Sequence, residues 1–125
     1  AAFIRAFILP ERQERWQLAL ASEKHRGKTL HRLAGSRDFR TDRMTAFDRA
    51  LASSEAIWKH LASFGAKESC HVISEIEDLD GRDMPTLEAL GECVGMGLGT
   101  VLSLIPGRLA YFEEENVKRR WILRC

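Results

Sequence analysis

Residues 100–114 have the sequence TVLSLIPGRLAYFEE, which predicts two neighbouring strands and therefore a β-sheet in this 125-residue chain. The segment 100–105 has apolar residues at adjacent positions, which is typical of a central strand covered on both faces. Pro106 and Gly107 indicate a turn, and residues 109–114 form the next strand. The sheet is therefore predicted to be antiparallel at its centre.

Two more strands extend this sheet. Residues 70–76 alternate, with Val72 and Ile76 on one side and Ile73 on the other. A turn at 116–118 precedes a last strand over 119–124, where Arg119 and Arg120 face the acidic residues 113–115 across a hairpin. We therefore expect a mostly antiparallel sheet of about four strands.

The first half of the chain predicts helices. Residues 10–34 indicate two short helices or one kinked helix, beginning at Pro10. Residues 42–51 indicate a further helical segment. Ser53 or Ser54 is expected to cap a helix that carries Trp58 and Leu61 and ends at Gly65.

The remaining segments lie among the strands. A short helix is predicted to open at residues 84–86, with Leu87, Leu90 and Val94 on its inner face. The glycine-rich run 95–99 leaves this helix and indicates a close approach of two backbones rather than a phosphate-binding loop. Trp58 and Leu61 are expected to be buried against four residues of the sheet: Val72, Leu102, Leu104 and Phe112.

The fold class is thus α+β, with N-terminal helices packed on a C-terminal sheet. We predict one domain over 1–125, with a helical part at about 10–65 and a strand-rich part at about 69–125. The apolar opening segment 1–9 and the last strand lie at the two ends of the chain. Because a small domain has a limited interior and a last strand can lie at a sheet edge, we expect a homodimer. The alternative is that residues 1–9 fold back over the sheet of the same chain and cover that edge.

Charge is unevenly distributed along the chain. Residues 1–50 contain eleven Lys and Arg against six acids, a net charge of +5, whereas residues 68–92 contain eight acids and one Arg, a net charge of −7. The whole chain carries only +1, so no global field favours nucleic acid or a membrane surface. No stretch of about 18 uncharged apolar residues is present, so no membrane span is expected.

The acidic segment 75–83 is the first candidate site. Glu75, Glu77, Asp78 and Asp80 supply the carboxylate oxygens that a hard cation such as magnesium requires. The alternatives are a solvated loop and a docking surface for a basic partner. No cofactor is expected, apart from a divalent cation if this site forms.

The basic N-terminal half is the second candidate. Seven cations lie close together in sequence: Lys24, Arg26, Lys28, Arg32, Arg37, Arg40 and Arg43. Such a cluster suits an acidic protein partner or a solvated face, and nucleic acid is less favoured because no nucleic-acid motif accompanies it.

Other candidate groups are scattered. The four histidines form no zinc-binding pair. Ser74 and Ser103 lie in neighbouring predicted strands and are expected to form a small polar spot beside His71 or Glu75 if they share a face. Trp58, Tyr111 and Trp121 are candidates for a ligand pocket between helices and sheet. The three cysteines, Cys70, Cys93 and Cys125, are expected to be reduced thiols of a cytoplasmic protein, with Cys125 near solvent.

Four motifs bear a resemblance to a known family: CHVIS at 70–74, LDGRDM at 79–84, GLGT at 97–100 and IPGRLAYF at 105–112. With these motifs, residues 54–115 resemble a family of small bacterial proteins of unknown function. The resemblance implies a bacterial, cytoplasmic protein and transfers no catalytic residue.

Three functional hypotheses remain. The first is a non-enzymatic binding or regulatory module with a protein partner. The second is a metal-dependent hydrolase that uses the acidic segment 75–83. The third is a small-ligand-binding protein that uses the aromatic pocket.

Overall fold

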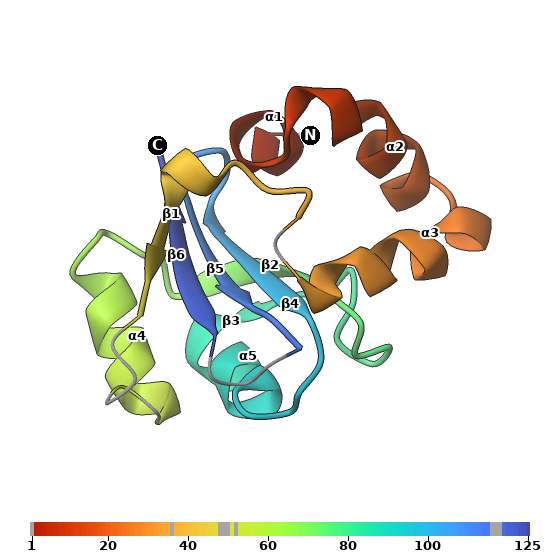
Figure 1. Cartoon of the computed structure of the whole chain (residues 1–125). Helices are drawn as coiled ribbons and strands as arrows, with labels where there is room; N and C mark the ends of the chain where they lie inside the picture. The colour runs from red at the N-terminus through yellow and green to blue at the C-terminus, as the bar shows by residue number, and fades with distance from the viewer. Residues whose placement is uncertain (1, 36, 48–50, 52, 116–118) are drawn as a thin grey trace.

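The computed structural model describes every residue except 1, 36, 48–50, 52 and 116–118. Within the described residues, six strands form one antiparallel sheet in the order β1-β6-β5-β4-β2-β3 (Figure 1). The strands are β1 (Met44–Ala46), β2 (Ser69–Ser74), β3 (Asp83–Pro85), β4 (Thr100–Ile105), β5 (Leu109–Glu113) and β6 (Arg120–Arg124). The helices are α1 (Ala2–Phe7), α2 (Pro10–Leu20), α3 (Glu23–Leu30), α4 (Ser54–Ala62) and α5 (Thr86–Cys93), with short 3-10 helices η1 (His31–Ala34) and η2 (Thr41–Arg43).

The predicted α+β fold is confirmed, with N-terminal helices followed by an antiparallel sheet and interspersed helices. The predicted strands correspond to β2, β4, β5 and β6, although β2 ends at Ser74 rather than at residue 76. β1 and β3 were not predicted. Each has three residues, which is too short for alternation of polar and apolar residues to be recognised.

The helix predicted over 42–51 is wrong. Its first residues belong to η2, and residues 44–46 form β1, which pairs with β6 through the register Thr45↔Ile122. The backbone N–H of Phe47 continues the ladder by donating to the carbonyl of Arg120 at 2.8 Å. Residues 48–50 of the predicted helix lie outside the described part. β6 is therefore paired on both sides, and the expectation of a last strand at the sheet edge is wrong.

The sheet has a hydrophobic core on each face, because successive residues of a strand point to opposite sides. One core joins the sheet to α4 and α5 and includes Ile57, Leu61, Leu90, Leu102, Tyr111 and Ile122. The other joins the opposite face to α1, α2 and η1 and includes Phe7, Trp16, Leu33, Val101, Phe112 and Leu123. The molecule thus has three layers, with the sheet in the middle (Figure 1).

Part of the predicted core is wrong, because neighbouring strand residues point to opposite faces of the sheet. Leu61 packs with Val72 and Leu102 as expected, but Phe112 lies in the core on the opposite face, because it follows Tyr111 directly in β5. Trp58 is only half-buried at the edge of the α4 side. In α5, Leu90 is buried as predicted and Leu87 is exposed, because the inner face continues through Ala89 and Cys93.

The predicted limits of α4 are confirmed. The Ser53 hydroxyl caps the helix by accepting a hydrogen bond from the Ala56 N–H at 3.1 Å. Gly65 follows the helix with φ +90°, a conformation that favours glycine.

The opening segment folds back onto its own chain. Phe3, Ile4 and Phe7 of α1 are buried in the core on the α2 side of the sheet, and Ile8 forms a β-bridge with Phe39. α1 therefore covers a face of the sheet rather than an edge. The apolar side chains of the opening segment are therefore buried within the chain, and the last strand is paired on both sides. Neither argument for the expected dimer holds, and the dimer stays a prediction.

Candidate functional site

A groove between α2 and α3 is the first candidate site, and we call it the basic groove. Its volume is about 500 Å³, and its described lining is Arg15, Leu18, Ala19, His25, Lys28, Thr29 and Arg32. Only Ala21 and Ser22 separate α2 from α3, and both helices contribute residues to the lining (Figure 1). No described residue that lines this groove is acidic.

Most basic side chains of the groove come from one helix, where their spacing places them on the same face. His25, Lys28 and Arg32 are three and four residues apart, which places them on one face of α3 and its continuation into η1. Seven residues of helix rise about 10 Å, so the three side chains form a stripe of that length. Arg15 adds a cation from α2.

The buried Asp38 holds one cation of the basic groove, Arg32, in place. This carboxylate is fully buried and accepts hydrogen bonds from Nε and Nη2 of Arg32 and, at 3.0 Å, from Nε1 of Trp16. Burial by itself would raise the pKa of Asp38, but the hydrogen bonds from Arg32 and Trp16 outweigh it and hold the pKa below its usual value. Asp38 therefore balances the charge of Arg32.

The other basic groups of the groove remain available to a ligand. In the part of the chain that the structure describes, no ion pair involves Arg15, His25 or Lys28. All three are exposed. Of the other cations in the predicted basic cluster, Arg26 is paired with Asp80, and the Lys24 side chain lies outside the described part.

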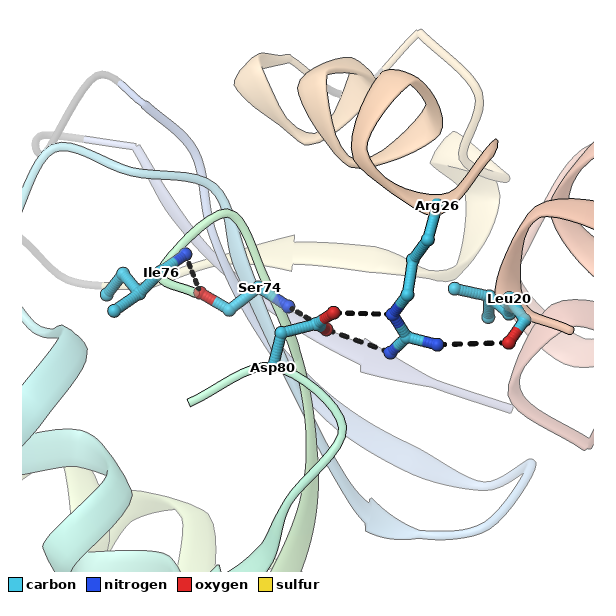
Figure 2. A network of polar contacts seen from close by, with 5 residues as sticks. All are labelled: Leu20, Arg26, Ser74, Ile76 and Asp80. Carbon is cyan, nitrogen blue, oxygen red and sulfur yellow. Dashed lines mark hydrogen bonds and ion pairs between the residues drawn. The ribbon is translucent and has the colours of Figure 1, made fainter. Parts of the chain in front are cut away.

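The acidic segment is held by a network that reaches α3 (Figure 2). Asp80 accepts from Nε of Arg26 and, at 2.9 Å, from Nη2, and it also accepts from the backbone N–H of Ser74 at 3.0 Å. Arg26 donates in addition to the carbonyl of Leu20 at 3.1 Å. The hydrogen bonds to Asp80 raise the pKa of Arg26, so this guanidinium stays charged. These hydrogen bonds connect the β2–β3 loop to α2 and α3.

Glu75, Glu77 and Asp80 of the predicted metal ligands line one cavity of about 340 Å³, but two of them already have partners within the fold. Asp80 uses both oxygens on Arg26, and Glu75 accepts from the Gly99 N–H at 2.9 Å with His31 at 3.4 Å from its other oxygen. Glu77 and Asp78 are exposed on the turn. Among the described residues, no group of three or more His, Cys, Asp or Glu side chains is placed to hold a metal ion. Sequence spacing could not reveal this, because Arg26 is 54 residues from Asp80.

The three predicted pocket aromatics are not brought together. Tyr111 is buried on the α4 side of the sheet, whereas Trp121 lies opposite Phe112 and belongs to the other face. Trp58 lies half-buried on α4. The prediction of one ligand pocket formed by these side chains is therefore wrong, because neighbouring strand positions alternate between faces.

The β5–β6 hairpin contains a buried charge, whereas the sequence indicated only that opposite charges face each other across it. Glu113 lies opposite Arg120, as predicted, but it is fully buried and accepts from Arg120 Nε at 3.0 Å. It also accepts from the Tyr111 hydroxyl at 2.8 Å and the Gly95 N–H at 3.0 Å. Burial, with the nearby Glu113 charge, raises the pKa of Tyr111 well above its usual value. All the described partners of this carboxylate lie within the fold, so the group is structural.

A second groove, of about 480 Å³, lies beside α1, and His71 and Ser103 are part of its lining. Asp83, His71 and Ser103 lie side by side on β3, β2 and β4, and His71 Nδ1 is 2.9 Å from Asp83 Oδ1. Ser74 is on the opposite face, where its hydroxyl bonds to Thr100 at 2.7 Å, so the two serines do not share a polar spot. Asp83 is 83% exposed, and the described hydrogen bonds include none from His71 to Ser103, so this row lacks the contact that would activate a serine.

The cysteines are free thiols in the structure, and only Cys125 is exposed. Burial raises the pKa of Cys70 to about 11 and raises that of Cys93 as well, which keeps both protonated and unreactive at neutral pH. The prediction that Cys125 lies near solvent is confirmed.

No family model, curated protein or solved structure matches this chain. The resemblance to a bacterial family therefore stays a prediction, and function has to be argued from the geometry. In the described part of the chain, no helix combines the length and the apolar character that crossing a bilayer requires.

Proposed function

We propose that this protein is a binding module that receives an acidic polypeptide segment in the basic groove. The observation that supports this proposal is a concave surface whose described lining combines Arg15, His25, Lys28 and Arg32 with no carboxylate. Opposite charges across an interface steer association and suppress wrong partners. A regular stripe about 10 Å long matches acidic side chains that recur every three or four residues on a partner helix.

A peptide suits this groove better than nucleic acid does. Leu18 lines the groove and is 64% exposed, which offers an apolar contact beside the charges. Single-stranded nucleic acid is held by stacking on aromatic side chains, and the described lining includes no aromatic ring other than the imidazole of His25. An acidic segment that also carries an apolar side chain therefore fits the groove.

The proposal is tested with a labelled peptide that places Glu at helical spacing next to a Leu. Fluorescence anisotropy measures its affinity for the wild type, for the groove variant Arg15→Glu/Lys28→Glu and for a control variant. The control, Arg82→Glu/Arg108→Glu, changes the net charge equally at two exposed arginines outside the groove. We expect the groove variant to bind about tenfold more weakly, or ~1.4 kcal/mol, and the control to change little.

Two results would contradict the proposal. An equal loss in both variants would mean that net charge alone attracts the peptide. Tighter groove-dependent binding of a single-stranded oligonucleotide with the same number of charges would assign the groove to nucleic acid instead.

A further inference from the structure

Three large hydrophobic side chains of the described residues are exposed, and two of them lie on surfaces of opposite charge. In the described part of the chain they are Leu18, Leu87 and Met96, which are 64%, 42% and 58% exposed. Leu18 lines the basic groove. Leu87 lies on α5, and Met96 follows that helix in the chain. Exposed apolar groups of this size on a small domain mark surfaces that contact other molecules.

The outer face of α5 is acidic. Glu88 and Glu92 are exposed one helical turn apart, beside Leu87, whereas Ala89, Leu90 and Cys93 form the buried face. This face thus has the same features that the basic groove requires of its ligand: two carboxylates at helical spacing and an exposed leucine.

We infer that α5 of a second copy of this chain occupies the basic groove. The inference rests on the proposed function and names the partner of the same site. Glu88 and Glu92 of one copy face Arg15 and Lys28 of the next, and Leu87 packs near Leu18. The charges are complementary, and the paired leucines remove apolar surface from water.

The positions of the two surfaces determine the kind of assembly. The basic groove belongs to the helices that cover one face of the sheet, and α5 covers the other face (Figure 1). One molecule therefore cannot place its own α5 in its own groove. The contact is head-to-tail, so it produces a ring if the rotation closes and an open chain if it does not. This assembly differs from the dimer through the last strand that the sequence predicted.

Charge reversal on each surface, followed by mixing, tests the inference. The groove variant is Arg15→Glu/Lys28→Glu, and the helix variant is Glu88→Lys/Glu92→Lys. Sedimentation velocity measures the mass of each protein at about 0.1 M and about 1 M salt, where the Debye lengths are ~10 Å and ~3 Å. Wild type should exceed the monomer mass of 14.2 kDa at the lower salt concentration and approach it at the higher one.

Each variant alone should sediment as a monomer, because its two surfaces then repel each other. An equimolar mixture should regain the assembly, since the reversed groove of one protein attracts the reversed helix of the other. The variant Leu87→Ser should weaken the wild-type assembly. As a control, Glu55→Lys/Glu115→Lys reverses two exposed acids outside α5 and should leave the assembly intact.

A wild type that stays monomeric at all concentrations, or a mixture no heavier than its components, would overturn the inference. The peptide measurement separates the two proposals. If the acidic peptide binds the groove but the chain does not self-associate, only the second copy is excluded as the partner. If neither binding occurs, the proposed function fails as well.

Discussion

Asp38 is the buried charge around which the helical half is arranged. It joins Trp16 of α2 to Arg32 of η1, and its backbone carbonyl accepts from Leu9 at 2.8 Å. Removing one partner of a buried ion pair leaves the other charge uncompensated, which costs several kcal/mol. The carboxylate thus links residues that are distant in the sequence.

We expect Asp38→Asn to lower the free energy of unfolding by about 3 kcal/mol at pH 7, measured by urea denaturation. The pKa of Asp38 in the folded protein lies below that of an unfolded Asp, near 3.9. The carboxylate therefore stabilises the fold fully above that value, and the stabilisation is lost as the pH falls through the lower, folded-state pKa. Stability of the variant should accordingly depend less on pH in this acidic range. Equal acid sensitivity of the two proteins would contradict the assignment.

At the scale of elements, Gly99 sets how closely η1 docks against the start of β4. A Cβ atom at Gly99 would lie 2.3 Å from the carbonyl oxygen of Leu33, which is closer than real atoms approach. The predicted close approach of two backbones at the glycine run is confirmed here. The Leu33 carbonyl belongs to the backbone and cannot rotate away as a side chain can. The η1 helix would therefore have to shift to make room for a methyl group at position 99.

Gly99→Ala should therefore destabilise the protein by about 1–3 kcal/mol, as overpacked sites do. Gly91→Ala is the matched control, because Gly91 lies in α5 with open space around it and alanine favours helix by ~1 kcal/mol. Chemical denaturation of both variants checks the prediction. If the two substitutions shift the midpoint in the same direction, the close packing of Leu33 on Gly99 is not present in solution.

At the scale of the whole molecule, the two cores share one sheet. Strands β2, β4, β5 and β6 contribute alternate residues to each core, so unfolding one core exposes the strand faces of the other. The Arg26–Asp80 network adds a link between the helical part and the β2–β3 loop (Figure 2). We therefore expect one cooperative domain, in agreement with the sequence prediction.

Methyl NMR during urea titration measures this cooperativity in a single sample. Ile8 reports on the core beside α1, and Ile57 reports on the core beside α4. Both native methyl signals should disappear at the same urea concentration, as two-state unfolding requires. Earlier loss of the Ile8 signal would show that the N-terminal helices unfold separately.

Local pattern in the sequence predicted the elements whose contacts are local. The limits of α4 follow from Ser53 and Gly65, the β4–β5 turn from Pro106 and Gly107, and the Glu113–Arg120 pair from a short hairpin. In each case the residues that determine the structure lie within about a dozen positions of one another.

The features that join distant segments depend on how the chain packs in three dimensions. The order of residues shows that 1–50 are basic and that 75–83 are acidic, but it does not show which charges meet. Folding pairs Arg26 with Asp80 across 54 residues and Arg32 with Asp38 beneath η1, and it leaves Arg15 and Lys28 exposed in a groove. It also gives β6 a second neighbour in β1 and so removes the expected open edge. The physical reason is that burial and pairing depend on which surfaces pack together, which local periodicity does not specify.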